Sequence, residues 1–104
     1  MKKDEIRSLN AKVTFCKYFY VLSNSKSRIA VTLQLEESAG YVSFSVANND
    51  AVVRGFLNVF DVVGEDDFDI MQLIDKPCMA YFNNDFKLVS ISNFLCKGNS
   101  FAVD

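Results

Sequence analysis

The densest group of reactive side chains in this sequence is a run of carboxylates in its second half. The run contains an aromatic residue, Phe68, and lacks the D-x-D-x-D-G spacing of an EF-hand loop, so we expect no metal there. A compact acidic surface suits a basic groove of a protein partner, one that normally holds nucleic acid. The residues that we predict to bind such a partner are Asp61, Glu65, Asp66, Asp67 and Asp69.

Aromatic and basic residues form a second group, in the first half of the chain. If this half folds as a sheet with one buried face, its other face mixes rings, cations and hydroxyls. Such a face can stack a base, hold a phosphate or form the centre of a protein interface, and an ordinary solvated sheet face is the alternative. Around a nucleotide we expect Tyr18, Tyr20, Arg28 and Tyr41, on a wider face with Lys12, Thr14, Thr32, Gln34, Ser43 and Ser45.

Catalytic chemistry has few candidates in this chain. The sequence contains no histidine, which excludes nucleophilic sites of the Ser/His or Cys/His kind, and its four glycines are scattered rather than grouped in a phosphate loop. We therefore expect no enzyme, no cofactor and no metal. Cys16, Cys78 and Cys96 are far apart, and we interpret them as small buried hydrophobes in a reducing cytosol.

Length and composition indicate one globular domain over residues 1–104. Half of the residues are hydrophobic and 23% are charged, which excludes a disordered acidic tail. No apolar run approaches the roughly 18 residues of a membrane span, and the start MKKDEIRSLN is not a signal peptide. We expect a cytoplasmic protein with no membrane partner.

Charge is distributed unevenly along the chain. Residues 1–28 hold seven basic and two acidic residues, a net charge of +5, whereas residues 29–104 hold four basic and eleven acidic residues, a net charge of −7. Such polarity can steer a charged partner or can belong to an ordinary solvated surface. Because the whole chain has a pI of about 5.0, we expect no direct contact with nucleic acid.

The elements that must position these residues begin with three strands. Alternating apolar residues predict strands over residues 8–22, 28–37 and 41–46, joined by short turns into an antiparallel meander. In the first strand we expect Val13, Phe15, Phe19 and Val21 on the buried face, which Lys17 interrupts, and the tyrosines on the open face.

Helical periodicity follows the meander. Apolar residues from Val52 to Val63 predict an amphipathic helix that Asn48-Asn49-Asp50 caps and Gly64 ends, with Gly55 allowing a close approach to the sheet. A short acidic helix starting at Asp66 or Asp67 and a hairpin of strands 78–82 and 86–95 complete the chain. The predicted fold is α+β, with the order β-β-β-α-α-β-β.

The second half of the chain resembles a group of small proteins of phages and mobile elements. The shared features are an apolar helix ending in V-V-G, an acidic helix start, a D/G-K-P turn and a final I-x-N/H-F/I-L strand. Between Val52 and Leu95 the sequence reads VVRGFLNVFDVVGEDDFDIMQLIDKPCMAYFNNDFKLVSISNFL. It departs from that group at Asp75, Phe68 and Asn93, where Gly, Trp and His are usual.

This resemblance implies a phage-encoded accessory protein in the cytoplasm of the host bacterium. Such proteins are often inhibitors of bacterial defence, including anti-CRISPR proteins. Our first hypothesis is a non-enzymatic inhibitor that binds a host defence protein, such as a CRISPR effector, by surface complementarity. The alternatives are a homo-oligomeric sponge for a cyclic nucleotide or related immune signal, with an interface of Phe94, Phe101 and Val103, and a structural or virion-associated module.

Overall fold

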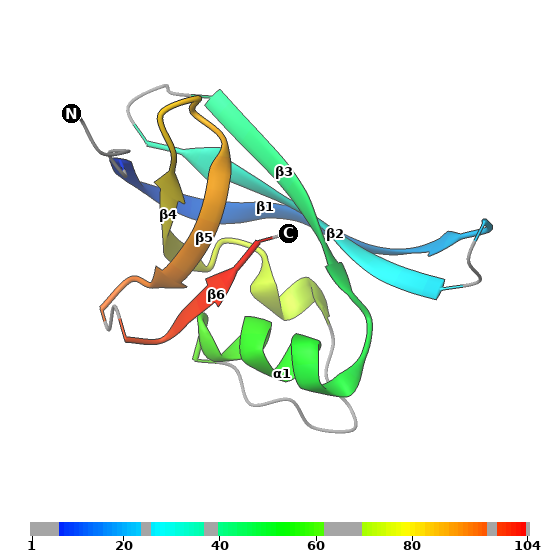
Figure 1. Ribbon diagram of the computed structural model, residues 1–104. Coiled ribbons are helices and arrows are strands. Elements are labelled where there is room, and N and C mark those ends of the chain that lie inside the picture. The colour runs from blue at the N-terminus through cyan, green and yellow to red at the C-terminus, as the bar shows by residue number, and fades with distance from the viewer. Residues whose placement is uncertain (1–6, 24–25, 37–39, 62–69, 96–97, 104) are drawn as a thin grey trace.

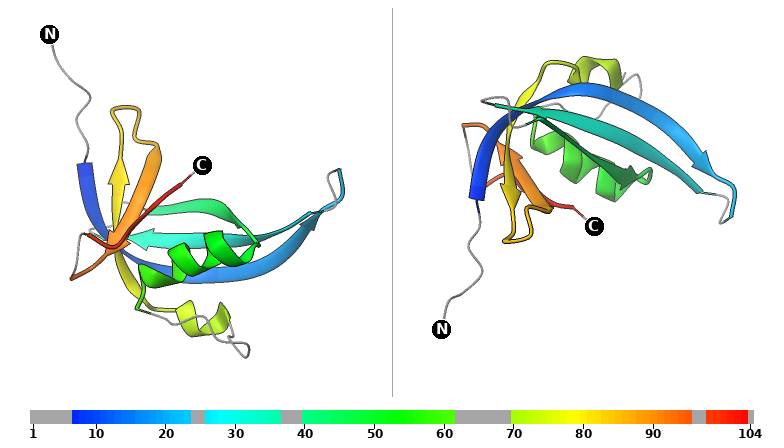
Figure 2. Two further views of the ribbon diagram at one scale, coloured as in Figure 1. Left: turned by 60° about the horizontal axis from the view of Figure 1, so that its bottom comes forward. Right: turned by 90° about the horizontal axis from the view of Figure 1, so that it is seen from above.

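A single antiparallel sheet of six strands, curled into a half-barrel, makes up most of the molecule (Figure 1). The computed structural model describes residues 7–23, 26–36, 40–61, 70–95 and 98–103. The strands lie in the order β3-β2-β1-β4-β5-β6, and one α-helix lies on the concave side of the sheet (Figures 1 and 2). The elements are β1 Arg7–Val21, β2 Lys26–Leu35, β3 Gly40–Ala47, α1 Asp50–Asn58, the 3-10 turn η1 Ile70–Leu73, β4 Pro77–Phe82, β5 Leu88–Asn93 and β6 Ser100–Ala102.

The prediction of a three-strand meander with two helices and a separate hairpin is wrong. The three N-terminal strands form close to the predicted residues, but β1 is 15 residues long and pairs with two partners. Its residues 11–21 pair with β2, and its residues 7–12 pair with β4. This sharing joins the expected hairpin to the meander, and residues 100–102 add a sixth strand on β5.

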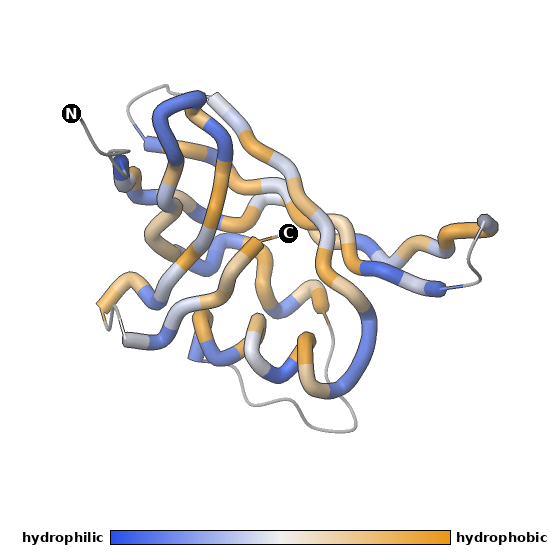
Figure 3. The backbone as a smooth tube through the Cα atoms, viewed as in Figure 1, coloured by the Kyte–Doolittle hydropathy of each residue, from blue (hydrophilic) through white to orange (hydrophobic). Residues whose placement is uncertain are grey.

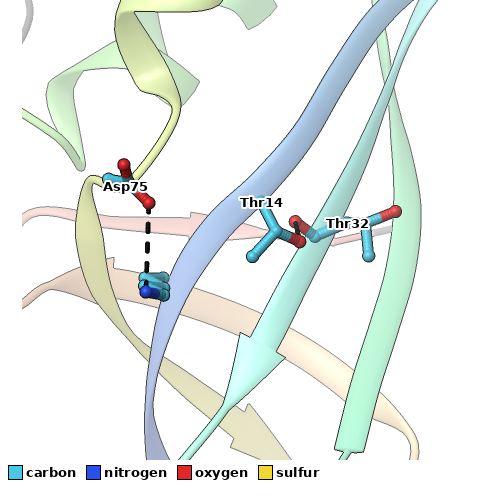
Figure 4. Close-up of polar contacts among 4 residues, drawn as sticks. Thr14, Thr32 and Asp75 are labelled. Atoms are coloured by element: carbon cyan, nitrogen blue, oxygen red, sulfur yellow. Dashed lines mark hydrogen bonds and ion pairs between the residues drawn. The ribbon is translucent and has the colours of Figure 1, made fainter.

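A β-bulge lies near the middle of β1. Val13 pairs with Leu33, whereas Phe15 pairs with Thr32, so Thr14 is one extra residue in the ladder. The Thr14 hydroxyl donates to the carbonyl of Thr32 at 3.3 Å (Figure 4). An extra residue reverses the side to which the following side chains point, because successive side chains of a strand alternate. The sequence pattern therefore predicts the wrong side of the sheet for the side chains of β1 beyond Thr14.

The segment before β4 hydrogen-bonds to β1 at Val13, next to the bulge. The amide of Asp75 donates to the carbonyl of Val13 at 2.7 Å, and the amide of Val13 donates to the carbonyl of Lys76 at 3.0 Å. Asp75 has a φ of 70°, in the left-handed region that glycine adopts most readily.

Helix α1 begins where the sequence predicts and ends earlier. The Asn49 side chain accepts a hydrogen bond from the amide of Val52 at 3.0 Å, which confirms the N-cap. The helix ends at Asn58 rather than at Gly64, because the chain passes into the left-handed region at Asp61, where φ is 58°. Gly64 and the start of the expected acidic helix lie outside the described residues, and a 3-10 turn occupies residues 70–73.

Asn93, at the end of β5, ties the helix end to the sheet. Its side-chain amide donates to the carbonyl of Val59 at 2.8 Å and to the carboxylate of Asp61 at 3.0 Å. The side-chain oxygen of Asn93, Oδ1, accepts from the backbone amide of Leu95 at 2.9 Å. Because Asn93 is buried, these bonds satisfy polar atoms that would otherwise be costly in the core.

Aromatic rings seal the concave side of the sheet. Phe56 of α1 makes edge-to-face contacts with Phe44 of β3, Phe60 and Phe101 of β6, with ring centroids 5.3–6.1 Å apart. Val103 also packs against the core. Phe101 and Val103 are therefore partly buried within one chain, whereas Phe94 is 42% exposed, and a subunit interface of these three residues stays a prediction.

Two of the three cysteines lie in this core. Cys16 and Cys78 are buried and form no disulfide, which confirms the interpretation of these two as buried hydrophobes; Cys96 lies outside the described residues. Burial raises the pKa of Cys16 to about 11 and the pKa of Cys78 to about 12, because the thiolate loses its hydration.

These two thiols should resist alkylation in the native protein. In a Cys96→Ser variant at pH 8, both raised pKa values leave little thiolate, so we expect iodoacetamide to label at least about a hundredfold more slowly than in urea. Mass spectrometry of timed samples measures the rate. Native labelling as fast as labelling of the unfolded chain would contradict the burial of Cys16 and Cys78.

Gly55 is not required for the packing of α1. A Cβ at this position would lie 3.9 Å from the Phe101 ring, an ordinary contact, so the expected close approach to the sheet does not explain this glycine. We predict that Gly55→Ala raises the free energy of unfolding by about 0.5–1 kcal/mol, because alanine restricts the unfolded chain and favours the helix. Urea unfolding tests this. A loss of stability would show that the helix lies closer to β6.

Candidate functional site

The bulge in β1 decides which side chains lie on the outer face, the side of β1–β3 away from α1. Before the bulge, Lys12 points outward opposite Gln34; after it, Phe15, Lys17 and Phe19 do so, opposite Thr32, Ala30 and Arg28. Strand β3 continues these rows. The outer face consists of Lys12, Phe15, Lys17, Phe19, Val21, Lys26, Arg28, Ala30, Thr32, Gln34, Tyr41, Ser43, Ser45 and Ala47.

Cations and rings alternate along the β1 side of this face. The order is Lys12, Phe15, Lys17 and Phe19, and the two phenylalanine side chains are 47% and 39% exposed. Side chains on one face of a strand repeat about every 7 Å. Figure 3 shows hydrophobic and hydrophilic residues alternating along these strands. Large exposed rings in a regular row with cations are unusual for a solvated sheet face.

Ser45 of β3 holds the Arg28 guanidinium against the sheet. Its Nε donates to the Ser45 hydroxyl at 2.9 Å, and one terminal nitrogen donates to the Ser45 carbonyl at 3.3 Å. Thr32 and Ser43 share a hydrogen bond at 2.9 Å next to this pair. These bonds use some of the five guanidinium hydrogens and hold the charge at Ser45 of β3, while Phe19 is the cross-strand neighbour of Arg28 on the β1 side.

The three strands that carry the outer face contain no acidic residue. Their charged residues are Arg7, Lys12, Lys17, Lys26 and Arg28. A carboxylate does approach at one end, where Asp75 lies 3.9 Å from the Lys12 ammonium (Figure 4). Both side chains of this pair are at least half exposed, so water screens the interaction. Arg7 pairs with the buried Phe82 and so lies on the inner side, and Glu36, directly after β2, adds a second carboxylate at the Lys12 end. Lys12, Lys17, Lys26 and Arg28 still make the face positive, although the whole chain has a net charge of −2.

A pocket of about 610 Å³ adjoins the same end of the outer face. It is lined by Lys12, Gln34 and Tyr41 of the outer face and, beyond β1, by Pro77 and Phe94. Register explains the grouping: Tyr41 pairs with Gln34, Gln34 with Lys12, and Lys12 with Pro77, so these residues form one row across four strands.

The structure divides the four residues that we expected around a nucleotide. Arg28 and Tyr41 lie on the outer face, whereas Tyr18 pairs with the buried Ile29, and Tyr20 lies two residues further on that inner side. Both tyrosines are exposed, because the β1–β2 hairpin extends beyond α1 as an arm (Figures 1 and 2). The bulge causes this division, so the four residues do not surround one ligand.

Sequence reasoning placed Phe15 and Phe19 in the core and missed them as surface residues. One signal was present, because the predicted buried face of β1 contained the charged Lys17. A charge on an otherwise apolar strand face is a conflict that an extra residue in the ladder removes. With the bulge, Cys16 points inward and Lys17 points outward.

The acidic surface that we predicted as a partner site is described at one residue only. Asp61 is exposed and accepts the hydrogen bond from Asn93, so it has a role at the helix end. Glu65, Asp66, Asp67 and Asp69 lie outside the described residues. The defence-protein inhibitor, with its CRISPR effector or similar partner, stays a prediction, as does the sponge.

In the part of the chain that the structure describes, no group of three or more His, Cys, Asp or Glu side chains has a geometry suited to a metal ion. None of the helices in the described part of the chain has the length and apolar character that crossing a membrane requires.

Comparison of the chain with protein-family models, with curated proteins and with solved structures finds no match.

Proposed function

We propose that the outer face of β1–β3 binds single-stranded nucleic acid. The observation that carries this proposal is the alternation of cations and exposed rings along β1, at Lys12, Phe15, Lys17 and Phe19. Every base has a flat apolar face that stacks on a ring, and every nucleotide adds one negative phosphate. A regular row of rings and cations therefore suits a single strand of nucleic acid, whatever its base sequence.

Charge segregation removes the objection from the acidic pI. We had expected no direct contact with nucleic acid because the pI is about 5.0. A pI averages over the whole chain, whereas a phosphate responds mainly to charges within about 8 Å at physiological salt. Four basic residues of β1–β3 lie on the outer face, and the carboxylates beside it, those of Asp75 and Glu36, lie at one end, so the local field along the rest of the face favours an anion.

Topology provides a second, weaker argument. Strand β1 pairs with both β2 and β4, and α1 connects β3 to β4, an order that resembles the OB-fold with its barrel open between β3 and β5. OB-folds bind oligonucleotides and oligosaccharides on the face of strands 2 and 3 and on the loop after strand 1. The outer face and the arm occupy the corresponding positions, although a fold alone does not decide a function.

Salt dependence should separate a phosphate contact from a general effect of charge. We predict that Lys17→Ala weakens binding to a fluorescein-labelled dT strand of 15 nucleotides. The slope of log K against log salt concentration should become less steep by about 0.7, the value for one lost phosphate contact with a single strand. Arg54→Ala is the matched control, because it removes one exposed positive charge from α1. Fluorescence anisotropy at several salt concentrations measures both. Equal effects of the two variants would contradict the proposed face.

Stacking should depend on the Phe19 ring. We predict that Phe19→Ala weakens binding about 5- to 150-fold, which corresponds to the loss of about 1–3 kcal/mol per stacked base. Phe19→Trp keeps a flat ring and should retain affinity. Phe19 is 39% exposed, so the alanine variant should fold, and circular dichroism checks this. A folded Phe19→Ala variant with unchanged affinity would exclude stacking at this position.

A further inference from the structure

The pocket at the end of the outer face contains the elements of a more specific site. It is lined by two exposed rings, those of Tyr41 and Phe94, which are 66% and 42% exposed. Between them lies Lys12, on β1. At about 610 Å³, the pocket falls within the range of ordinary small-ligand sites. The order of the strands therefore places the Lys12 ammonium between two rings on which bases can stack.

The spacing of the strands suggests what occupies this pocket. Two strand intervals separate Lys12 from Tyr41 on one side and from Phe94, just after β5, on the other. Neighbouring strands are about 4.8 Å apart, so each ring lies roughly 10 Å from the lysine backbone along the sheet. We propose that the pocket holds one dinucleotide step, with a base on each ring and the linking phosphate at the Lys12 ammonium.

This inference rests on the proposed binding of single strands and adds a preference among bases. Glu36 lines the pocket near Tyr41 and contributes a carboxylate, which accepts hydrogen bonds and repels phosphate. Carboxylates accept from the N4 amino group of cytosine, whereas thymine presents an oxygen there. The pocket therefore favours cytosine over thymine, two bases of similar size.

Asp75 limits the availability of the Lys12 charge. The two groups lie 3.9 Å apart, and both side chains are well exposed, so the pair is weak. Asparagine also tolerates the left-handed conformation of Asp75, where φ is 70°. Asp75→Asn should therefore preserve the fold and release Lys12 for a phosphate.

The test compares dC and dT strands of 15 residues by fluorescence anisotropy, with wild-type protein and single variants. We expect the wild type to bind dC at least about fivefold more tightly than dT, and Glu36→Gln to remove this difference. Tyr41→Ala and Phe94→Ala should each weaken binding about 5- to 150-fold. Asp75→Asn should tighten binding about two- to fivefold at low salt, and Asp85→Asn, in the exposed β4–β5 turn, is the matched control with no such effect.

The outcomes distinguish the pocket from the face. If Phe19→Ala weakens binding while Tyr41→Ala and Phe94→Ala do not, the dinucleotide site is excluded and the proposed function remains. If the wild type binds dC and dT equally, the role of Glu36 is excluded. If the wild type binds neither strand, both the proposed function and the pocket inference fail.

Discussion

The half-barrel depends on one strand that hydrogen-bonds to two different partners. The first residues of β1 pair with β4 and its remaining residues pair with β2, so this strand joins two sets of strands that would otherwise be separate. The bulge at Thr14 and the bonds from Asp75 and Lys76 to Val13 lie where the change of partner occurs. There the extra residue adds twist, which allows a single strand to belong to both sides of a curved sheet.

Sequence patterns predict the parts of this fold that depend on local periodicity. In β2 and β3 the alternation identifies the inward residues, such as Ile29, Val31 and Val46, and the Asn49 cap is correct. The patterns do not predict which strands become neighbours, because hydropathy alternates in the same way whatever the partner. They also miss the bulge, since Thr14 is a common strand residue and the charge of Lys17 on an otherwise apolar face is an indirect signal.

For the same reason, the sequence predicts only part of the candidate site correctly. Arg28 and Tyr41 were assigned to the correct side, because no irregularity precedes them on their own strands. Phe15 and Phe19 were assigned to the core, since a one-residue shift exchanges the two faces of a strand. Overall charge says little about a single surface, because strands β1–β3 contain no acidic residue although the whole chain has a net charge of −2.

Helix α1 has a mechanical consequence for the half-barrel. Among the described strands, no hydrogen-bonded ladder joins β3 to β5 or β6, and the Phe56 ring spans that gap by touching Phe44 on one side and Phe101 on the other. Ring contacts are not directional in the way that hydrogen bonds are, so they permit small sliding motions at little energetic cost. The sheet should therefore be rigid where β1 pairs with β2. It should deform more easily between β3 and β6, with Phe56 as the point of contact about which the two edges move.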